Sequence, residues 1–179
     1  FTISTRGNMT TVTGNDGSGV IYGCRELIDH VGQYKDLKFP AQLTDAPEMV
    51  LRGGCVGIQK MEYLPGRGVY EYPYTPESFP WFYDKEQWIK YLDMLVENRM
   101  NSLYLWNGHP FASLVKLEEY PFAVEVDEET FKKNEEMFSF LTAEADKRGI
   151  FVIQMFYNIL LSKPFAEHYG LKTQDRNRP

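Results

Sequence analysis

Along the chain, segments in which apolar residues have helical spacing alternate with short continuous apolar runs. This alternation predicts the order of the elements. Over residues 84–98 apolar residues recur every three or four positions, which is the period of an amphipathic helix. An apolar run at 102–106 follows, and the same succession returns as a helix over 127–148 and an apolar run over 150–157. Such runs are typical of strands buried in a parallel sheet. A further run at 49–56 predicts the first strand of that sheet.

The ends of the two predicted helices carry the expected capping residues. Asp84 is an N-cap, and Gln87 stands three positions later, as in a capping box. The second helix begins with acidic residues at 127–129 and ends in Lys-Arg-Gly at 147–149, which suits the two ends of the helix dipole. Residues 57–83 are expected to form a long loop. The order is therefore strand, helix, strand, helix, strand, joined by right-handed crossovers.

The sequence pattern of residues 1–44 predicts a smaller unit before the parallel sheet. Two β-prone runs, 1–5 and 10–13, suggest a hairpin, and 16–32 has helical periodicity. The expected buried stripe of this helix consists of Ile21, Cys24, Leu27, Ile28 and Val31. We expect Cys24 and Cys55 to be buried thiols, because two cysteines form no disulfide framework. A proline-containing linker then divides the chain into domains at 1–44 and 45–179.

Composition excludes several classes of partner. The net charge is −6 and no basic surface is concentrated in the chain, which argues against nucleic acid. No apolar run is long enough to predict a membrane span. The three histidines lack ligand spacing, so we predict no metal and no cofactor. We expect a secreted or periplasmic protein, and any targeting segment has been removed or was never included in this sequence. The oligomeric state is left open.

The candidate chemistry lies at the ends of the predicted strands. The glycine-rich phosphate fingerprint is missing after the first strand, which favours a (β/α)8 barrel over a nucleotide-binding sheet. In such barrels the carboxyl ends of the strands form the active face. Trp106, Asn107 and His109 follow the second strand, and Tyr157 and Asn158 follow the third. Aromatic faces beside hydrogen-bonding groups suit a sugar, although each side chain could instead be a core or turn residue.

The predicted loop at 57–83 is dense in aromatic residues. These residues are Tyr63, Tyr70, Tyr72, Tyr74, Phe79, Trp81, Phe82 and Tyr83. They could form stacking platforms for an oligosaccharide or a packing surface against another domain or subunit. Both interpretations remain open at this stage.

Three motifs, in this order, resemble those of family 20 glycoside hydrolases, the β-N-acetylhexosaminidases. Asp16-Gly-Ser-Gly-Val-Ile-Tyr-Gly-Cys-Arg-Glu-Leu is similar to the helix of the small α/β domain before their barrel. Asp45-Ala-Pro-Glu-Met-Val-Leu-Arg-Gly is similar to the segment that starts the barrel. Asn98-Arg-Met-Asn-Ser-Leu-Tyr-Leu is similar to the turn into the second strand.

The resemblance implies an α/β fold with two parts. Residues 1–44 would be the end of an α+β accessory domain, and 45–179 would be the first three strands of an incomplete (β/α)8 TIM barrel. It also implies that Arg52 contacts sugar hydroxyls. The chain departs from the family pattern at Gly54-Cys55-Val56, and the catalytic Asp-Glu pair of the family would lie beyond Pro179.

We therefore expect a fragment of a glycoside hydrolase whose partners are a carbohydrate and the remainder of the barrel. A hexosaminidase-like activity on an oligo- or polysaccharide is the first interpretation, and this chain alone would lack the catalytic carboxylates. One alternative is an α-glucuronidase-like hydrolase, in which Arg52 would bind the carboxylate of an acidic sugar. Another is a non-catalytic carbohydrate-binding or interaction module.

Overall fold

The computed structural model describes residues 1–36, 39, 41–64, 68–107, 112–156 and 161–171. For residues 61–64, 68–71, 107 and 156 it describes the backbone alone.

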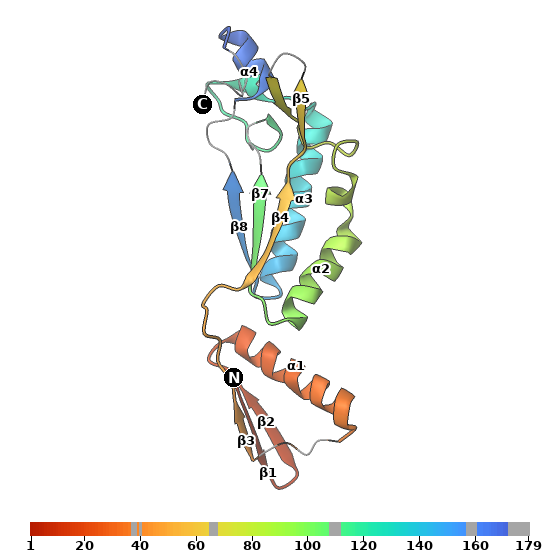
Figure 1. The fold of residues 1–179 in the computed structure, drawn as a ribbon, viewed down its shortest axis with the longest axis vertical. Coiled ribbons are helices and arrows are strands. Elements are labelled where there is room, and N and C mark those ends of the chain that lie inside the picture. Colours follow the sequence, from red (N-terminus) through yellow and green to blue (C-terminus); the bar gives the residue numbers. More distant parts are fainter. Residues whose placement is uncertain (37–38, 40, 65–67, 108–111, 157–160, 172–179) are drawn as a thin grey trace.

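The first part of the chain is a three-stranded antiparallel sheet with one helix (Figure 1). Its elements are β1 (Thr2–Arg6), β2 (Met9–Thr13), α1 (Gly17–Tyr34) and β3 (Gln42–Thr44), and the strand order is β2-β1-β3. The Asp16 side chain caps α1 by accepting a hydrogen bond from Gly19 N at 2.7 Å. The predicted hairpin and helix are confirmed. The third strand was not predicted, because its three residues lie in the segment assigned to the linker.

The buried face of α1 differs from the predicted stripe. Tyr22 and Gly23 are its buried residues, whereas Cys24 is exposed and Ile28 is 60% exposed. A Cβ atom at Gly23 would lie 2.5 Å from Cγ1 of Val12, so the missing side chain lets the helix approach the sheet. Close packing through glycine therefore overrides the apolar periodicity. The second thiol that we expected to be buried, Cys55, is also exposed.

The second part of the chain is a parallel three-stranded sheet covered by two helices. Its elements are β4 (Gly53–Ile58), α2 (Lys85–Glu97), β7 (Ser102–Asn107), α3 (Glu128–Asp146) and β8 (Phe151–Phe156). The sheet order is β4-β7-β8, which is the order of the strands along the chain, and α2 and α3 lie on one side of it (Figure 1). Both helices are capped as predicted, since Asp84 accepts from Gln87 N and Asp127 from Thr130 N.

The second part of the chain also contains three kinds of short element. They are the two-stranded hairpin β5 (Met61–Leu64) and β6 (Gly68–Glu71), the 3-10 turns η1 (Pro80–Tyr83) and η3 (Pro121–Ala123), and the helix α4 (Lys163–His168). The prediction of a structureless loop over 57–83 is therefore wrong. The division into domains at residue 44 stays a prediction, although β3 ends there and the next sheet begins at Gly53.

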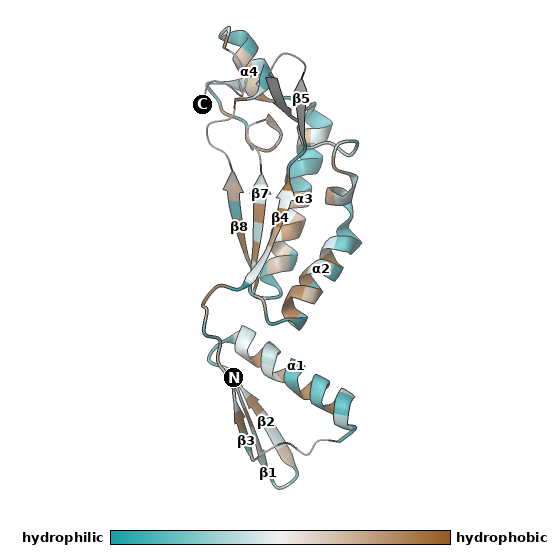
Figure 2. Cartoon of the chain, viewed as in Figure 1, coloured by the Kyte–Doolittle hydropathy of each residue, from teal (hydrophilic) through white to brown (hydrophobic). Residues whose placement is uncertain are grey.

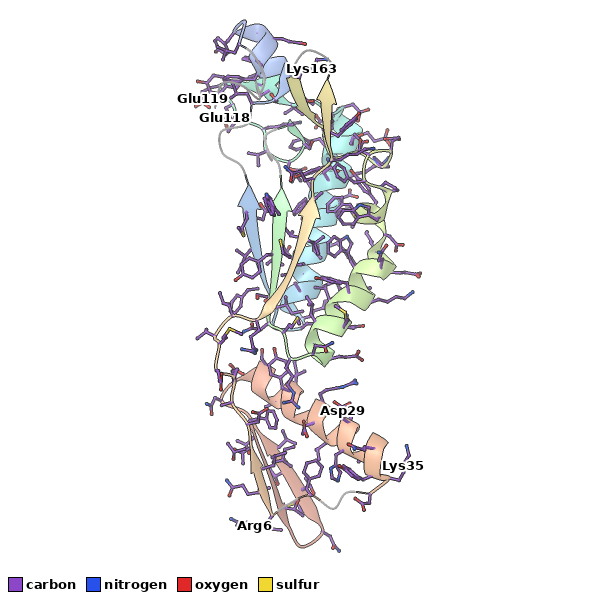
Figure 3. The ribbon with its side chains drawn as sticks, viewed as in Figure 1. Arg6, Asp29, Lys35, Glu118, Glu119 and Lys163 are labelled. Carbon is purple, nitrogen blue, oxygen red and sulfur yellow. The ribbon has the colours of Figure 1, made fainter. Side chains whose placement is uncertain are left out.

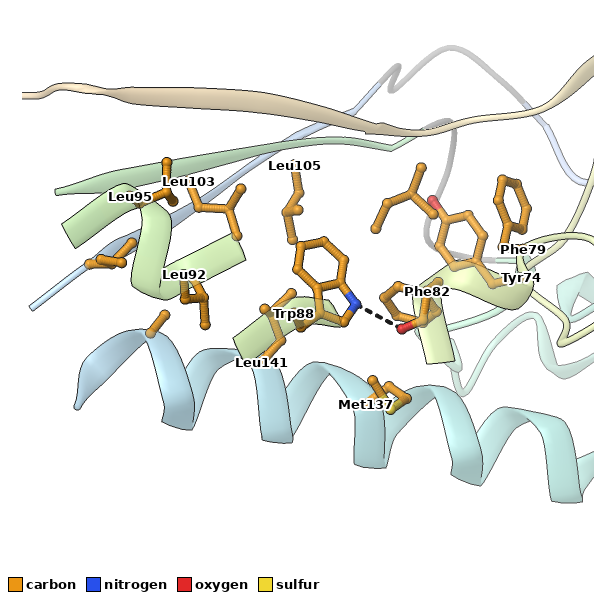
Figure 4. Packing of buried hydrophobic residues seen from close by; sticks show 13 residues of the cluster. Tyr74, Phe79, Phe82, Trp88, Leu92, Leu95, Leu103, Leu105, Met137 and Leu141 are labelled. Atoms are coloured by element: carbon orange, nitrogen blue, oxygen red, sulfur yellow. Dashed lines mark hydrogen bonds between the residues drawn. The ribbon is translucent and has the colours of Figure 1, made fainter. Parts of the chain in front are cut away.

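The core lies between the parallel sheet and its two helices (Figure 4). Its members from the parallel strands and the two helices are Ile58 of β4, Trp88, Leu92 and Leu95 of α2, Leu103 and Leu105 of β7, and Met137, Leu141 and Ala145 of α3. Trp88 also donates a hydrogen bond from Nε1 to the carbonyl of Phe82 at 2.8 Å. Figure 2 shows hydrophobic colour on the three strands and hydrophilic colour along much of the two helices, as a one-sided core requires.

The face of the sheet away from the helices remains uncovered by the described residues. Phe151 of β8 is 63% exposed, and Met155 is exposed as well. The expectation that the third strand is buried on both faces is therefore not met in this chain. Helices cover one face, and the other presents apolar side chains.

The aromatic segment before α2 belongs largely to the core. Tyr74, Phe79 and Phe82 are buried in the same cluster, and the rings of Tyr74 and Phe79 meet edge to face at 5.4 Å. For these residues, stacking on a sugar and packing against another subunit are both wrong interpretations. The side chains of Tyr63 and Tyr70 lie outside the described structure.

Two adjacent glycines allow β4 to approach its neighbours. A Cβ atom at Gly53 would lie 1.7 Å from the carbonyl oxygen of Ser102, and one at Gly54 would lie 2.5 Å from Oη of Tyr91. Neither distance is compatible with a side chain. The Gly-Gly pair is thus explained by packing between strand and strand, and between strand and helix.

Replacing Trp88 by phenylalanine should lower the free energy of unfolding by about 2 kcal/mol, because it opens a cavity and leaves the Phe82 carbonyl without its donor. Denaturant titration of the full-length protein measures the loss. The same replacement at Trp106, which is 41% exposed, is the matched control and should cost less than about 1 kcal/mol. Equal losses at the two positions would contradict the assignment of Trp88 to the core.

Candidate functional site

The predicted site residues that the structure describes lie at two opposite edges of the parallel sheet. Trp106 and Asn107 end β7 at the carboxyl edge, whereas Arg52 directly precedes β4 at the amino edge. The side chain of Asn107 lies outside the described structure, as do residues His109, Tyr157 and Asn158. Among the described side chains, the sheet therefore separates Arg52 from Trp106.

Arg52 is bound by main-chain carbonyls at the amino edge. Its Nε donates to the carbonyl of Arg99 at 2.9 Å, and its Nη1 donates to the carbonyls of Met49 at 2.7 Å and Val50 at 3.2 Å. The guanidinium also lies over the ring of Tyr22, 5.9 Å from its centroid. The first strand was predicted to include residues 49–52; instead these residues lie outside it, and the carbonyls of Met49 and Val50 accept hydrogen bonds from Arg52.

Asn101 and Arg52 hold each other through reciprocal hydrogen bonds. Arg52 N donates to Oδ1 of Asn101 at 2.8 Å, and the backbone N atoms of Asn101 and Ser102 donate to the Arg52 carbonyl at 2.8 and 3.0 Å. The Asn101 carbonyl accepts from Phe151 N at 2.8 Å. These bonds align the starts of all three parallel strands. The Arg-Gly and Asn-x-x-Asn motifs therefore have a structural role in this chain.

A cleft of about 770 Å³ separates α1 from this amino edge. Arg99 lines the cleft and adopts a left-handed backbone, with φ 56°. Its guanidinium forms ion pairs with Glu26 of α1 and with Asp45, the latter at 2.6 Å. Tyr22 Oη adds a hydrogen bond to the Met100 carbonyl. The ion pairs of Arg99 thus join the first part of the chain to the second.

Trp106 lies on the sheet face that carries no helix. It pairs across the sheet with Gly57 of β4 and Met155 of β8. Two residues earlier on the same face, Tyr104 pairs with Cys55 and with Ile153. The helix-free face therefore presents an aromatic strip that ends at the carboxyl edge, and Trp106 is the last described side chain on it.

A buried hydrogen-bond network fixes the backbone behind the carboxyl edge. Asn134 of α3 is fully buried, and its Nδ2 donates to the carbonyls of Tyr74 and Ser113, each at 2.9 Å. Its Oδ1 accepts from Tyr83 Oη at 2.5 Å, and Ser113 Oγ accepts from Tyr74 N at 2.9 Å. One amide therefore connects the segments that follow β4 and β7.

The sequence analysis did not identify Asn134, although a signal was present. It lies three positions after Phe131 and seven before Leu141, on the apolar stripe of α3. A lone polar residue on such a stripe indicates a buried hydrogen-bond network. The segments connected here leave the strands at the carboxyl edge, so this network supports the backbone of the candidate site.

Burial raises the pKa of three tyrosines, Tyr22, Tyr83 and Tyr91. It raises the pKa of Tyr83 well above its usual range, with a smaller contribution from the negative charge of Glu77. Burial likewise raises the pKa of Tyr22 and of Tyr91, and Arg52 opposes this effect at Tyr22. The higher pKa extends to more alkaline pH the range in which the Tyr83 hydroxyl is protonated and donates to Asn134.

The described carboxylates near the carboxyl edge are mostly in solvent. Glu77, Glu118 and Glu119 are exposed, and Figure 3 labels the last two at this end of the molecule. Glu125 accepts a hydrogen bond from Lys163 N at 2.7 Å.

Within the described ranges, no group of three His, Cys, Asp or Glu could hold a metal ion. No helix in these ranges is long and apolar enough to cross a membrane.

No family model matches the chain, and no curated protein matches it. Among solved structures, one similar protein is described as a "GH138 enzyme targeting pectin rhamnogalacturonan II". It is 78% identical over the whole of this chain, with a TM-score of 0.90. The chain is similar to part of a GH138 glycoside hydrolase. It spans 21% of the length of that enzyme.

This similarity corrects the family expected from the motifs. A match at 78% identity along the whole chain outweighs three short motifs, so the family 20 assignment is wrong and a hexosaminidase-like specificity is not supported. The coarser expectation, a mixed α/β fold with a parallel sheet and a likeness to glycoside hydrolases, is confirmed.

Replacing Arg52 by methionine should affect stability, whereas replacing Trp106 by alanine should affect carbohydrate binding. The first change removes the donor to three carbonyls, so it should lower the free energy of unfolding by about 2 kcal/mol and leave carbohydrate affinity unchanged. The second should weaken binding with little loss of stability, because the ring is partly exposed. Thermal denaturation and carbohydrate titration of the full-length protein measure the two effects. Weakened binding by a stable Arg52→Met variant would return Arg52 to the substrate site.

The Tyr83 hydroxyl should make the protein sensitive to alkali. Because its pKa is higher in the folded than in the unfolded chain, its contribution is fully present below pH 10, the ordinary tyrosine value, and is lost as the pH rises towards the folded value. Denaturant titrations at a series of pH values should therefore show a steeper alkaline loss of stability for the natural protein than for a Tyr83→Phe variant. Identical pH profiles would contradict this interpretation.

Proposed function

We propose that the protein containing this chain is a glycoside hydrolase that acts on a pectic polysaccharide. The observation that carries the proposal is the 78% identity to a GH138 enzyme over the whole of this chain. At this level of identity the backbone and most side-chain environments are retained. Because the chain spans 21% of that enzyme, the activity belongs to the whole protein, and this chain contributes part of its framework.

We also propose that residues 45–179 begin a (β/α)8 barrel and that 1–44 belong to a separate small domain. Strand order supports the barrel, because β4, β7 and β8 are neighbours in chain order and both helices cover the same face. A doubly wound sheet reverses its strand order and places helices on both faces. The apolar face presented by Trp106, Phe151 and Met155 would then line the barrel interior.

In this proposal the residues at the carboxyl edge of the sheet hold substrate and do not break bonds. A glycosidase needs two carboxyl groups across the scissile bond, and these are assigned to parts of the protein outside this chain. Trp106 supplies an aromatic face at the carboxyl edge, and Asn107, His109, Tyr157 and Asn158 stay predicted substrate contacts. We further propose that the protein is secreted or periplasmic, since a polysaccharide is too large to cross a membrane unaided.

The test is incubation of the full-length protein with rhamnogalacturonan II, with an aryl β-N-acetylglucosaminide and with an aryl glucuronide. Release of reducing ends from the polysaccharide is expected, with none from the N-acetylglucosaminide. Cleavage of the glucuronide would favour the alternative in which the substrate sugar is acidic. The Trp106→Ala variant should lower kcat/KM for the polysaccharide at least about tenfold.

Two results would contradict the proposal. Binding of rhamnogalacturonan II without release of reducing ends, at any enzyme concentration, would indicate a non-catalytic carbohydrate-binding protein. Absence of both binding and cleavage would remove pectic polysaccharide as the substrate class.

A further inference from the structure

A continuous group of aromatic rings lies beyond the carboxyl edge of the parallel sheet. It comes from two elements that are distant in sequence, η3 and α4, which meet at the end of the molecule towards which the strands point (Figure 1). We call this group the aromatic patch; its members are Tyr120, Phe122, Phe165, His168 and Tyr169.

The rings of the aromatic patch are in mutual contact. Phe122 stacks on His168 with ring centroids 4.1 Å apart and on Phe165 at 5.9 Å, with an interplanar angle of 25° in both pairs. Tyr120 meets the edge of Phe165 at 5.3 Å, and Tyr169 meets the same ring at 5.0 Å. Phe165 and Phe122 are therefore the inner rings, and they support the other three.

The outer rings are exposed. Tyr169 is 51% exposed, and Tyr120 and His168 are exposed as well, whereas Phe122 and Phe165 are half-buried. An apolar side chain that is left in water beside a packed core usually marks a binding surface when several such residues adjoin. The aromatic patch meets this condition, because its exposed rings adjoin one another and rest on a fixed inner pair.

Hydrogen bonds to the rest of the chain hold the aromatic patch in place. Ser162 caps α4 by accepting from Phe165 N, and Lys163 N donates to Glu125. At the other end of the helix, Leu171 N donates to the carbonyl of the buried Ala166. The start of α4 is thus fixed against the segment that carries η3 and its end is closed by its own backbone, so the fold determines the positions of the exposed rings.

The chemistry of the aromatic patch fits a carbohydrate. Pyranose rings present apolar C–H faces and a rim of hydroxyl groups, and tyrosine and histidine present an apolar face with a polar atom at the ring edge. Glu118 and Glu119 lie at this end of the molecule with Lys163 (Figure 3), and Lys163 is paired with Glu167 at 3.9 Å. A nucleic acid would need uncompensated positive charge, which these residues do not supply.

We propose that the aromatic patch is an accessory subsite that binds the substrate polysaccharide away from the bond that is cleaved. The inference rests on the proposed function, because that function supplies a polymer long enough to pass from the carboxyl edge across α4. Trp106 lies at the carboxyl edge and the aromatic patch lies beyond it, so one polysaccharide molecule can contact both. Binding of this kind stabilises substrate and transition state equally and changes KM, not kcat.

Alanine replacements of Tyr120 and Tyr169 in the full-length protein test the proposal. Each should raise KM for rhamnogalacturonan II roughly fivefold and leave kcat unchanged. Short fragments prepared from the same polysaccharide should be cleaved with unchanged KM, since they do not reach the aromatic patch. A Tyr169→Phe variant should keep the affinity, because it keeps the stacking face. The matched control is Tyr34→Ala, at a tyrosine 58% exposed on α1, which should change neither constant.

Migration in native gels that contain rhamnogalacturonan II gives a second measurement that needs no catalysis. Retardation should weaken in the Tyr120→Ala and Tyr169→Ala variants and persist in the control. If the protein binds the polysaccharide but does not cleave it, the proposed function fails while this measurement still tests the aromatic patch.

Three outcomes would overturn the inference. Unchanged KM and unchanged migration in both alanine variants would show that the rings do not bind the polymer. An equal rise in KM for the short fragments would place the rings in the catalytic cleft. A lower melting temperature with unaltered binding would show that another part of the protein covers the aromatic patch.

Discussion

The parallel sheet depends on the reciprocal hydrogen bonds between Arg52 and Asn101. Both groups lie before their strands begin, and the Asn101 carbonyl extends the same alignment to Phe151 of the third strand. Once these three starts are aligned, the register along the sheet follows, and Trp106 falls beside Gly57 and Met155 at the far end. The guanidinium of Arg52 binds the carbonyl of Arg99, so the left-handed turn before β7 belongs to the same arrangement.

This arrangement assigns different roles to the two edges of the sheet. At the amino edge the charged and polar groups bind one another, and Arg99 joins this edge to α1 through Glu26. At the carboxyl edge a buried amide, Asn134, holds the backbone from behind, while the aromatic rings of Trp106 and of the aromatic patch stay accessible. Both edges are therefore held by hydrogen bonds, and the exposed aromatic rings that we propose as a binding surface lie at or beyond the carboxyl edge.

The sequence predicted those elements that local interactions determine. The limits of α2 and α3 follow from Asp84 and Asp127, whose side chains cap their own helices within three residues. Contacts between distant residues determine what was missed. The start of β4 depends on Asn101, forty-nine positions from Arg52, and the contact face of α1 depends on the space that Gly23 leaves for Val12. Tyr74, Phe79 and Phe82 look like a binding loop in sequence, because their burial requires α2 and α3 to be in place.

The same distinction explains why the motifs indicated a likeness to glycoside hydrolases and yet pointed to the wrong family. Arg52 and Asn101 lie in the segments that resemble family 20, and both act in starting the sheet. A motif of this kind indicates that two families start their parallel strands with similar hydrogen bonds. It carries no information about which sugar is bound. Specificity is expected in the loops beyond the carboxyl ends, where insertions do not disturb the sheet. Trp106 lies at the carboxyl end of β7 and the aromatic patch lies beyond it, so in our proposal these rings contact the substrate and Arg52 does not.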